Sequence, residues 1–318
     1  MSDYSLLEFL KLGAYWASYL YFPAAVLLLF RLTKARGRPI VAFALALLSV
    51  LAYARFVEPR ILLTRRHEIT LDRCFGEAGA IRLAVFSDMH IGIFANAMPL
   101  RRIAAAADAV DPDAVLIAGD FVYFLKREKF EVAFSALAGI EAPVFAVLGN
   151  HDVGFPGPDV GAPLKDSLGR LGVVDVENRS QKVVLAESRR PVEIAGLSDA
   201  WQRRQDMRAV ASPSALPRIL LTHNPLTAFD VPAGADVDLL VAGHTHGGQI
   251  YVPFFTCKFL SAACRPFREG LGQANGRQVF ITSGTGMVGL PMRFLVPPRL
   301  DVLDIRYEQC RDRSTATL

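Results

Sequence analysis

The chain has 318 residues, of which 52% are hydrophobic and 21% charged, and its formal net charge is +4. This modest charge, without a basic stripe that is interleaved with aromatic side chains, argues against nucleic acid as a binding partner. About 60 residues belong to an N-terminal apolar part. The roughly 250 that remain are many for one domain but lie within the range of α/β architectures.

Two uncharged apolar runs come first in the chain. Residues 12–30 form a run of 19 residues, and a helix needs about 20 apolar residues to cross a bilayer. The second run, residues 39–54, is somewhat short, so it is either a second span or a segment that lies at the membrane interface. We interpret residues 1–56 as a membrane anchor with one or two spans and expect the protein in the inner cell membrane. The alternative is that both runs are core helices of a soluble domain.

Basic residues flank both runs, so they do not decide on which side of the membrane the rest of the chain lies. The loop 31–38 carries four basic residues and no acidic one, which favours a cytoplasmic loop and an outer domain. The segment after the second run is similarly basic, with Arg55, Arg60, Arg65, Arg66 and Arg73.

The four cysteines, Cys74, Cys257, Cys264 and Cys310, show no CxxC spacing. This excludes a zinc ribbon and a thioredoxin motif. Cys257 and Cys264 are either two free thiols or a pair, the latter if the domain lies outside the cytoplasm.

From residue 81 onward, apolar runs alternate with helical patterns. We expect strands at residues 81–86, 114–118, 143–148, 218–221 and 238–242, and helices at residues 98–110 and 130–137. Short β-branched and leucine-rich runs that end at glycine or at polar motifs suit a sheet covered on both faces. Residues 57–80 are then a linker, residues 81–306 one domain, and residues 307–318 a C-terminal tail.

Five of the six histidines lie in short motifs that each follow a predicted strand. The candidate metal ligands in these motifs are Asp88, His90, Asp120, Asn150, His223, His244 and His246. Loops converge at the carboxyl edge of an α/β sheet, so these side chains should meet there. Imidazole and carboxylate groups suit divalent Mn, Fe or Zn. Seven donors exceed the needs of one ion, so we predict two ions that share a bridging carboxylate.

Four further residues have more ordinary interpretations. His67 is expected to be a solvated linker residue, and Thr245 a turn residue between two candidate ligands. Asp199 either approaches the site or caps a loop. Arg293 either contacts a phosphate or forms a structural ion pair.

In this order the motifs resemble those of the calcineurin-like metallophosphoesterase superfamily, whose pattern is D-x-H, GD, GNH[DE], a lone H and GHxH. Here they stand as Asp88-Met89-His90, Gly119-Asp120, Gly149-Asn150-His151-Asp152, His223 and Gly243-His244-Thr245-His246. The continuation over residues 247–249, with residues 283–286 and 291–294, is similar to a bacterial membrane-associated branch. The resemblance implies an α/β fold, a four-layer αββα sandwich in which helices flank two β-sheets.

The resemblance also assigns roles to residues. It implies that Asp88, His90 and His246 hold one ion, that Asn150, His223 and His244 hold the second, and that Asp120 bridges both. It implies that His151 is not a ligand but lies near the scissile phosphate, where it donates a proton or a hydrogen bond. Asp152 would orient the His151 imidazole and stabilise its charge.

The expected function is that of a membrane-anchored phosphoesterase with two metal ions. It would hydrolyse a phosphodiester, phosphomonoester or pyrophosphate bond with metal-activated water. One alternative is a UDP-2,3-diacylglucosamine pyrophosphatase, whose lipid-linked substrate would suit the membrane runs and the apolar stretch 250–255, unless that stretch is a buried strand. Another class is a non-catalytic membrane scaffold with a structural metal site. Because no candidate ligand lies in residues 1–56, their removal is expected to leave hydrolysis of a soluble substrate largely intact.

Overall fold

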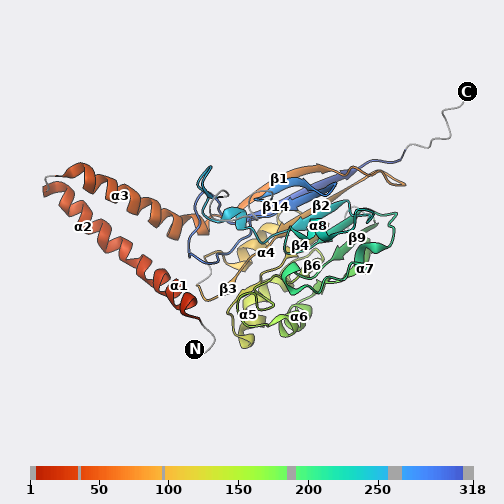
Figure 1. The fold of residues 1–318 in the computed structure, drawn as a ribbon, viewed down its shortest axis with the longest axis horizontal. Coiled ribbons are helices and arrows are strands. Elements are labelled where there is room, and N and C mark those ends of the chain that lie inside the picture. Colours follow the sequence, from red (N-terminus) through yellow and green to blue (C-terminus); the bar gives the residue numbers. More distant parts are fainter. Residues whose placement is uncertain (1–4, 35–36, 95–96, 185–190, 257–266, 311–318) are drawn as a thin grey trace, which may run out of the picture.

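The computed structural model describes residues 5–34, 37–94, 97–184, 191–256 and 267–310. Figure 1 shows two parts, an N-terminal helical hairpin and a layered body of sheets and helices from which the hairpin projects.

The first sheet has six strands in the order β1-β14-β2-β4-β6-β7. These strands are β1 (Leu63–Thr70), β14 (Arg299–Tyr307), β2 (Gly79–Phe86), β4 (Ala114–Ala118), β6 (Val144–Val147) and β7 (Val173–Asp175). In this sheet β2, β4, β6 and β7 run parallel to one another, whereas β14 is antiparallel to β2 and parallel to β1.

The second sheet also has six strands, in the order β12-β13-β11-β10-β9-β8. They are β12 (Gly270–Ala274), β13 (Arg277–Ile281), β11 (Leu239–Ala242), β10 (Arg218–Leu221), β9 (Pro191–Gly196) and β8 (Arg179–Val184). The four central strands are parallel and the two edge strands antiparallel to their neighbours. A small third sheet pairs β3 (Ile91–Gly92) with β5 (Val122–Tyr123).

Alternating apolar side chains make the layers. In β4, Leu116 and Ala118 face the second sheet, while Val115 and Ile117 face the helices on the outer side. Those helices are α4 (Leu100–Asp108), α5 (Phe130–Phe134) and α6 (Gly161–Arg170), and the outer face of the second sheet carries α7 (Arg208–Ala211) and α8 (Thr227–Asp230). Burial of each large aliphatic side chain contributes about 1.5–3 kcal/mol. The four-layer sandwich predicted from the sequence is confirmed.

The hairpin consists of α1 (Leu6–Ala17), a 3-10 turn, α2 (Tyr21–Lys34) and α3 (Arg38–Ala52), which continues through a π turn to Arg60. Its two continuous helices, Leu6–Leu32 and Arg38–Arg60, are 27 and 23 residues long and apolar enough to cross a membrane. Only 11% of the most apolar 18-residue stretch of each is buried. These helices therefore do not form the core of a soluble domain.

The segment predicted as a linker, residues 57–80, contains structure of its own. It holds β1, whose eight residues pair with β14, and the first residues of β2. The prediction for His67 is wrong, since this side chain lies on β1, bonds Asp301 at 2.8 Å and packs against the Phe280 ring. Beyond β14, Cys310 forms a disulfide with Cys74, with 4.9 Å between their Cα atoms. Cys257 and Cys264 lie outside the described residues.

The apolar stretch 250–255 is not a buried strand. Only Ile250 forms an isolated bridge, to Phe294, and the chain turns after it. The side chain of Phe254 is 94% exposed, and those of Val252 and Phe255 are also exposed. This stretch presents its apolar side chains to the surroundings of the protein.

Candidate metal centre

The seven candidate ligands come from five loops that follow the carboxyl ends of β2, β4, β6, β10 and β11. Five of them have a left-handed backbone, with φ of 52° at Asp88, 46° at His90, 54° at Asp120, 71° at His244 and 50° at His246. Non-glycine residues in this region cost on the order of 1–3 kcal/mol each and concentrate at functional sites. The loops therefore hold these side chains together at some expense of backbone stability.

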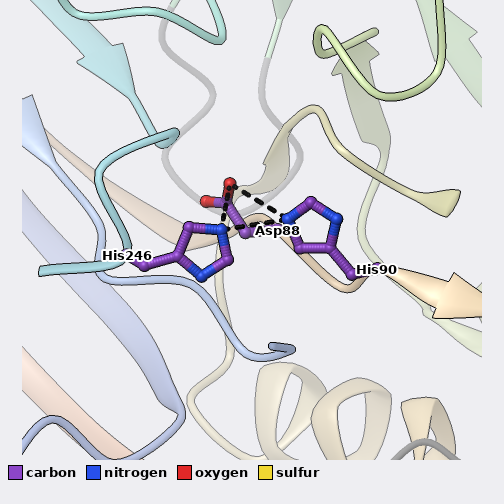
Figure 2. A group of neighbouring side chains, drawn as sticks. All are labelled: Asp88, His90 and His246. Atoms are coloured by element: carbon purple, nitrogen blue, oxygen red, sulfur yellow. Dashed lines mark hydrogen bonds and ion pairs between the residues drawn. The ribbon is translucent and has the colours of Figure 1, made fainter. Parts of the chain in front are cut away.

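Asp88, His90 and His246 form the first donor set, and Figure 2 shows their side chains pointing toward one another. The Nε2 atoms of His90 and His246 are 2.9 Å apart. Oδ1 of Asp88 lies 3.3 Å from Nε2 of His246 and 3.9 Å from Nε2 of His90. The other carboxylate oxygen of Asp88 accepts hydrogen bonds from the Ser87 hydroxyl and the His244 amide. Oδ1 also accepts from the His244 amide, at 3.2 Å, and it is the oxygen that faces the imidazoles.

Asn150, His223 and His244 form the second donor set. Oδ1 of Asn150 lies 3.0 Å from Nε2 of His223 and 3.0 Å from Nδ1 of His244. The Asn150 amide nitrogen donates to the carbonyl of Phe155, which turns Oδ1 toward the imidazoles. Nδ1 of His223 is 2.7 Å from the Ala118 carbonyl. Because a carbonyl only accepts, Nδ1 carries a hydrogen, and Nε2 is the nitrogen that faces the donor set and can bind a metal once it is deprotonated.

Asp120 joins the two sets. Its Oδ2 lies 3.5 Å from Nε2 of His90 and 3.2 Å from Nε2 of His223. Its Oδ1 accepts a hydrogen bond of 2.9 Å from the amide of His151. The structure therefore gives Asp120 one oxygen for the neighbouring loop and one between the donor sets.

These distances fit bound divalent ions. With metal–ligand bonds of about 2.1 Å, neighbouring ligand atoms around one ion are about 3.0–3.4 Å apart. Most contacts within each set lie near this range, and Oδ2 of Asp120 would serve both ions. Two imidazole nitrogens 2.9 Å apart also suit a shared cation, since each can direct a lone pair toward it. The buried His and Asp clusters are consistent with a dinuclear metal site.

Burial sets the charges of most donors. It lowers the pKa of His90 and His246 well below the usual value, and that of His244 to about 3. These imidazoles are therefore neutral near pH 7, as a metal ligand must be. Burial also raises the pKa of Asp88 to about 6, because a carboxylate is poorly solvated there.

Asp120 and His223 behave as an ion pair. Burial alone would raise the pKa of Asp120, but the charge of His223 and its hydrogen bond outweigh burial and hold that pKa well below the usual value. Burial alone would lower the pKa of His223, but the Asp120 carboxylate and the charges of Asp88 and Asp199 hold it well above 6.5. Metal binding at the second set must therefore displace a proton from His223.

His151 lies beside the donor sets, with its ring edge-to-face with His90 and 4.8 Å from it between centroids. One of its ring nitrogens also falls in a donor group with His90 and Asp120. Burial lowers its pKa, and the positive charges of His223 and Lys11 act in the same direction. Its assignment as a leaving-group donor rather than a ligand stays a prediction.

Asp152 does not orient the His151 imidazole by a hydrogen bond among the described residues. Its carboxylate accepts hydrogen bonds from the amides of Phe121, Val122 and Gly149. It thus ties together the loops that follow β4 and β6. Burial raises its pKa to about 8, and the nearby Asp120 charge contributes to the shift.

Two glycines of the motifs allow close approach of the loops. A Cβ atom on Gly149 would lie 2.2 Å from Oδ1 of Asp120, and one on Gly243 would lie 2.6 Å from Oδ2 of Asp88. Neither carboxylate could keep its place beside a larger residue. The glycines are therefore required by the packing of the ligands themselves.

The other singled-out residues make structural contacts. Arg293 is fully buried and donates to the carbonyls of Gly286, Val296 and Ser283, and within the part of the chain that the structure describes it forms no ion pair. Asp199 accepts from the Trp201 amide as a helix cap, and its charge also acts on His223, so this residue both caps a helix and approaches the site. Thr245 closes the turn between two candidate ligands, as predicted.

Sequence analysis missed two aromatic residues at the site. The Tyr123 ring is edge-to-face with His151 at 4.8 Å and with His90 at 5.9 Å, and the Trp201 ring is edge-to-face with His244 at 5.1 Å. Tyr123 follows Asp120 by three residues, but nothing in its motif marks it as part of the site.

Comparison with known proteins agrees with this geometry. The sequence pattern of the calcineurin-like phosphoesterase family matches residues 81–248. The chain is 29% identical to phosphodiesterase YaeI of Escherichia coli, over 83% of this chain and 96% of that protein. It is 28% identical to the uncharacterized metallophosphoesterase YkuE of Bacillus subtilis, over 80% and 89% of the two chains.

Two more distant similarities complete the comparison. The UDP-2,3-diacylglucosamine pyrophosphatase LpxG of Chlamydia trachomatis is 24% identical, over 80% of this chain and 93% of that protein. Among solved structures, TT1561 of Thermus thermophilus superposes with a TM-score of 0.46 at 12% identity, over 65% of this chain and 90% of that chain.

Proposed function

The chain belongs to the calcineurin-like phosphoesterase family, and from this premise we propose that it is a membrane-anchored phosphodiesterase with two divalent ions. The observation that carries the proposal is the position of Oδ2 of Asp120, which lies within 3.5 Å of a nitrogen from each donor set. A structural metal site would need only one set and is usually closed by cysteine ligands. Mn, Fe and Zn all suit the imidazole and carboxylate donors.

Different residues of the chain would have different roles in the proposed hydrolysis. When bound, two divalent ions would activate a water molecule and neutralise charge on the phosphoryl oxygens. Asp88, His90 and His246 would hold one ion, Asn150, His223 and His244 the other, and Asp120 both. His151 would donate a proton or hydrogen bond to the leaving oxygen. The negative charge of a bound phosphoryl group would favour its protonated form and offset the effect of burial.

The full chain loaded with Mn²⁺ tests this proposal against bis-p-nitrophenyl phosphate and p-nitrophenyl phosphate. We expect about two ions per chain by elemental analysis, because seven donors exceed one coordination shell, and faster hydrolysis of the diester. Protein that holds two ions but cleaves neither ester would support the scaffold hypothesis. A metal content that stays near one per chain would contradict the shared carboxylate.

Apolar surface supports the membrane part of the proposal. In addition to the exposed hairpin, loops of the body expose apolar side chains, namely Phe254, Leu290 and Leu295. The loop that contains Leu290 and Leu295 joins the end of the hairpin, since the amide of Arg293 donates to the Ala54 carbonyl at 2.9 Å. Exposed apolar patches that continue a candidate span suit the interfacial region of a bilayer.

We further propose that the body lies outside the cytoplasm. The Cys74–Cys310 disulfide is of a kind that persists mainly in oxidising compartments. The basic loop 31–38, at the tip of a two-span hairpin, would then be cytoplasmic, as the distribution of positive charge favours. A C-terminal fusion to alkaline phosphatase, which is active only outside the cytoplasm, should be active. Activity of a matched cytoplasmic reporter instead would reverse the orientation.

A lipid pyrophosphate is the second candidate substrate. The similarity to the pyrophosphatase LpxG and the exposed apolar loops beside the hairpin favour it. Adding UDP-2,3-diacylglucosamine in detergent to the same assay would test it, with release of UMP as the measured product. Hydrolysis of the p-nitrophenyl diester without cleavage of this lipid would leave the general phosphodiesterase proposal in place.

A further inference from the structure

A buried polar contact joins the first helix of the hairpin to the body. Nζ of Lys11 donates to the Tyr123 hydroxyl at 2.6 Å and to Oε1 of Glu8 at 3.2 Å. The Tyr123 hydroxyl in turn donates to Oε1 of Glu8 at 3.3 Å. Glu8 is 3% exposed and the Lys11 side chain 14% exposed. The three side chains form a triangle of hydrogen bonds, in which Lys11 and Tyr123 are 112 residues apart in the sequence.

The triangle touches the metal centre through Tyr123. This ring is completely buried and packs edge-to-face against His151, the proposed donor, and against His90, a candidate ligand. Its hydroxyl contacts come from α1, through Lys11 and Glu8. The hydroxyl of this ring is therefore contacted by a helix that carries no candidate ligand.

The rest of α1 is arranged in two faces, of which one is buried and the other exposed. Its buried positions, Glu8, Tyr15 and, just after the helix, Ser18, share a face with Lys11 at spacings of three and four residues. Tyr15 stacks on Phe94 at 5.6 Å between ring centroids. The opposite face is apolar and exposed, with Leu6 at 75% and Trp16 at 66%.

Two further polar contacts hold the second helix of the hairpin, one to the end of the first helix and one to the body. Nε of Arg55 donates to the Ser18 hydroxyl at 3.0 Å, and Oε1 of Glu58 accepts from the Val296 amide at 2.6 Å. Both ends of the hairpin are therefore docked by polar groups. Ionisable side chains in a membrane-associated helix are costly to bury and usually mark a functional site.

We propose that α1 completes the active site, with Lys11 as a positioning residue that fixes the Tyr123 phenol and, through it, the His151 imidazole. The inference rests on the proposed phosphodiesterase function. It replaces the expectation that residues 1–56 can be removed without effect on hydrolysis of a soluble substrate. The helix that anchors the protein would thereby also determine how well the site works.

The test compares full-length variants loaded with Mn²⁺ on two soluble diesters, bis-p-nitrophenyl phosphate and diphenyl phosphate. Lys11→Met removes the donor at similar length, and Lys11→Arg keeps a donor. Tyr123→Phe keeps the ring and removes the hydroxyl. Arg31→Met is the matched control, because Arg31 is an exposed cation on α2 of the same hairpin.

We expect Lys11→Met to lower kcat on diphenyl phosphate by about tenfold, as for the loss of one charged hydrogen bond, with KM and metal content nearly unchanged. The loss should shrink on bis-p-nitrophenyl phosphate, whose better leaving group needs less help from His151. Lys11→Arg should restore most of the rate. Tyr123→Phe should match Lys11→Met, and the double variant should be no slower than either one.

Wild-type kcat on both diesters in folded Lys11→Met would overturn the inference. So would additive losses in the double variant, since independent effects mean that Lys11 does not act through Tyr123. If Lys11→Met does not fold, Tyr123→Phe alone decides, because wild-type kcat without the hydroxyl excludes the positioning role. Wild-type protein that carries two ions and cleaves neither diester would contradict the proposed function instead.

Discussion

The loops of the metal centre and the outer part of the hairpin depart in opposite ways from the usual distribution of residues in a soluble protein. The loops bury polar groups, with Asp88 and His223 completely inaccessible. The hairpin exposes apolar ones, with Ile40 77% and Phe43 72% exposed on α3. Buried polar groups need hydrogen bonds, buried charges need an opposite charge or a metal ion, and a large exposed apolar surface needs an apolar surrounding. The first region is therefore suited to divalent ions and the second to lipid.

The first helix, α1, has features of both regions, since it buries charged residues on one face and exposes apolar residues on the other. Its outer face resembles the rest of the hairpin, while its inner face carries the Glu8–Lys11 pair against Tyr123. The apolar hairpin and the body that holds the candidate metal centre thus share one packed contact. Changes to the metal loops should alter catalysis and leave membrane association intact, and changes to the outer hairpin should do the reverse.

The largest effect is expected for Asp120→Ala. Loss of the shared oxygen should lower the metal content toward one ion or fewer per chain, and the rate should fall by about 10³-fold or more. Elemental analysis and diester hydrolysis measure both, and the protein should stay in the membrane fraction. Two tightly held ions in this variant would show that Asp120 is not the bridge.

The second largest effect is expected for His151→Ala. Both ions should remain, and the rate should fall by about 10²–10⁴-fold, with a smaller loss for p-nitrophenyl esters. Since one of its ring nitrogens lies within a donor group with His90 and Asp120, the metal content is the decisive measurement. A site emptied as completely as by Asp120→Ala would make His151 a ligand.

Gly149→Ala should displace the Asp120 carboxylate, because the new Cβ would lie 2.2 Å from Oδ1. We expect a loss of metal affinity of about 10–100-fold, the range for disturbed support of a ligand. Gly169→Ala is the control, since nothing lies within 4 Å of a Cβ there in α6 and the free energy of unfolding should rise by about 0.5–1 kcal/mol. Equal metal titrations for the two variants would contradict the tight packing of the loops.

Metal binding should release protons, and its affinity should rise with pH. The pKa of His223 is held well above 6.5 in the metal-free protein, so a proton must leave before Nε2 can bind an ion. The pKa of Asp88 is raised to about 6, so below about pH 6 this carboxyl group must also lose a proton before it can bind an ion. Each released proton changes the apparent affinity by about tenfold per pH unit. Calorimetric titration with Mn²⁺ in two buffers of different protonation enthalpy counts the protons, and a count of zero at pH 7 would refute the His223–Asp120 ion pair.

The smallest effect on catalysis is expected for Phe43→Asp on the outer hairpin. A charge in the middle of a membrane helix costs about 2.5–3.5 kcal/mol on insertion scales, so less protein should reach the membrane fraction. The kcat of folded protein on a soluble diester should stay unchanged. Val132→Asp on α5 is the control, because Val132 is 80% exposed on the body, and unchanged fractionation of both variants would argue against insertion of α3.

The central strands could be predicted from the sequence because their signals are local. The bounds predicted for β4 and β10 are those observed, since each is an apolar run that stops at a polar motif. By contrast, β1 was assigned to a linker. It is an edge strand with exposed charged residues such as Arg65 and Arg66, and edge strands lack the apolar pattern of buried ones.

The candidate ligands were predictable for a similar reason, and the surroundings of the site were not. Each ligand stands in a short motif after a strand, so strand order alone places it at one edge of a sheet. The partner of Asp152 was predicted to be the adjacent His151, but its hydrogen bonds go to three backbone amides of two loops. Neighbours in sequence can point in different directions, and only packing decides which contact forms.

By itself, the sequence determined the two apolar helices and the set of candidate donors, because hydrophobicity and ligand chemistry are properties of short segments. Only the tertiary structure decided that Cys74 meets Cys310, 236 residues away, and that Lys11 meets Tyr123. Such contacts depend on how whole layers pack, and no local pattern encodes them. The shared oxygen of Asp120 is of the same kind, since its distances to His90 and His223 are set by the packing of loops from both sheets.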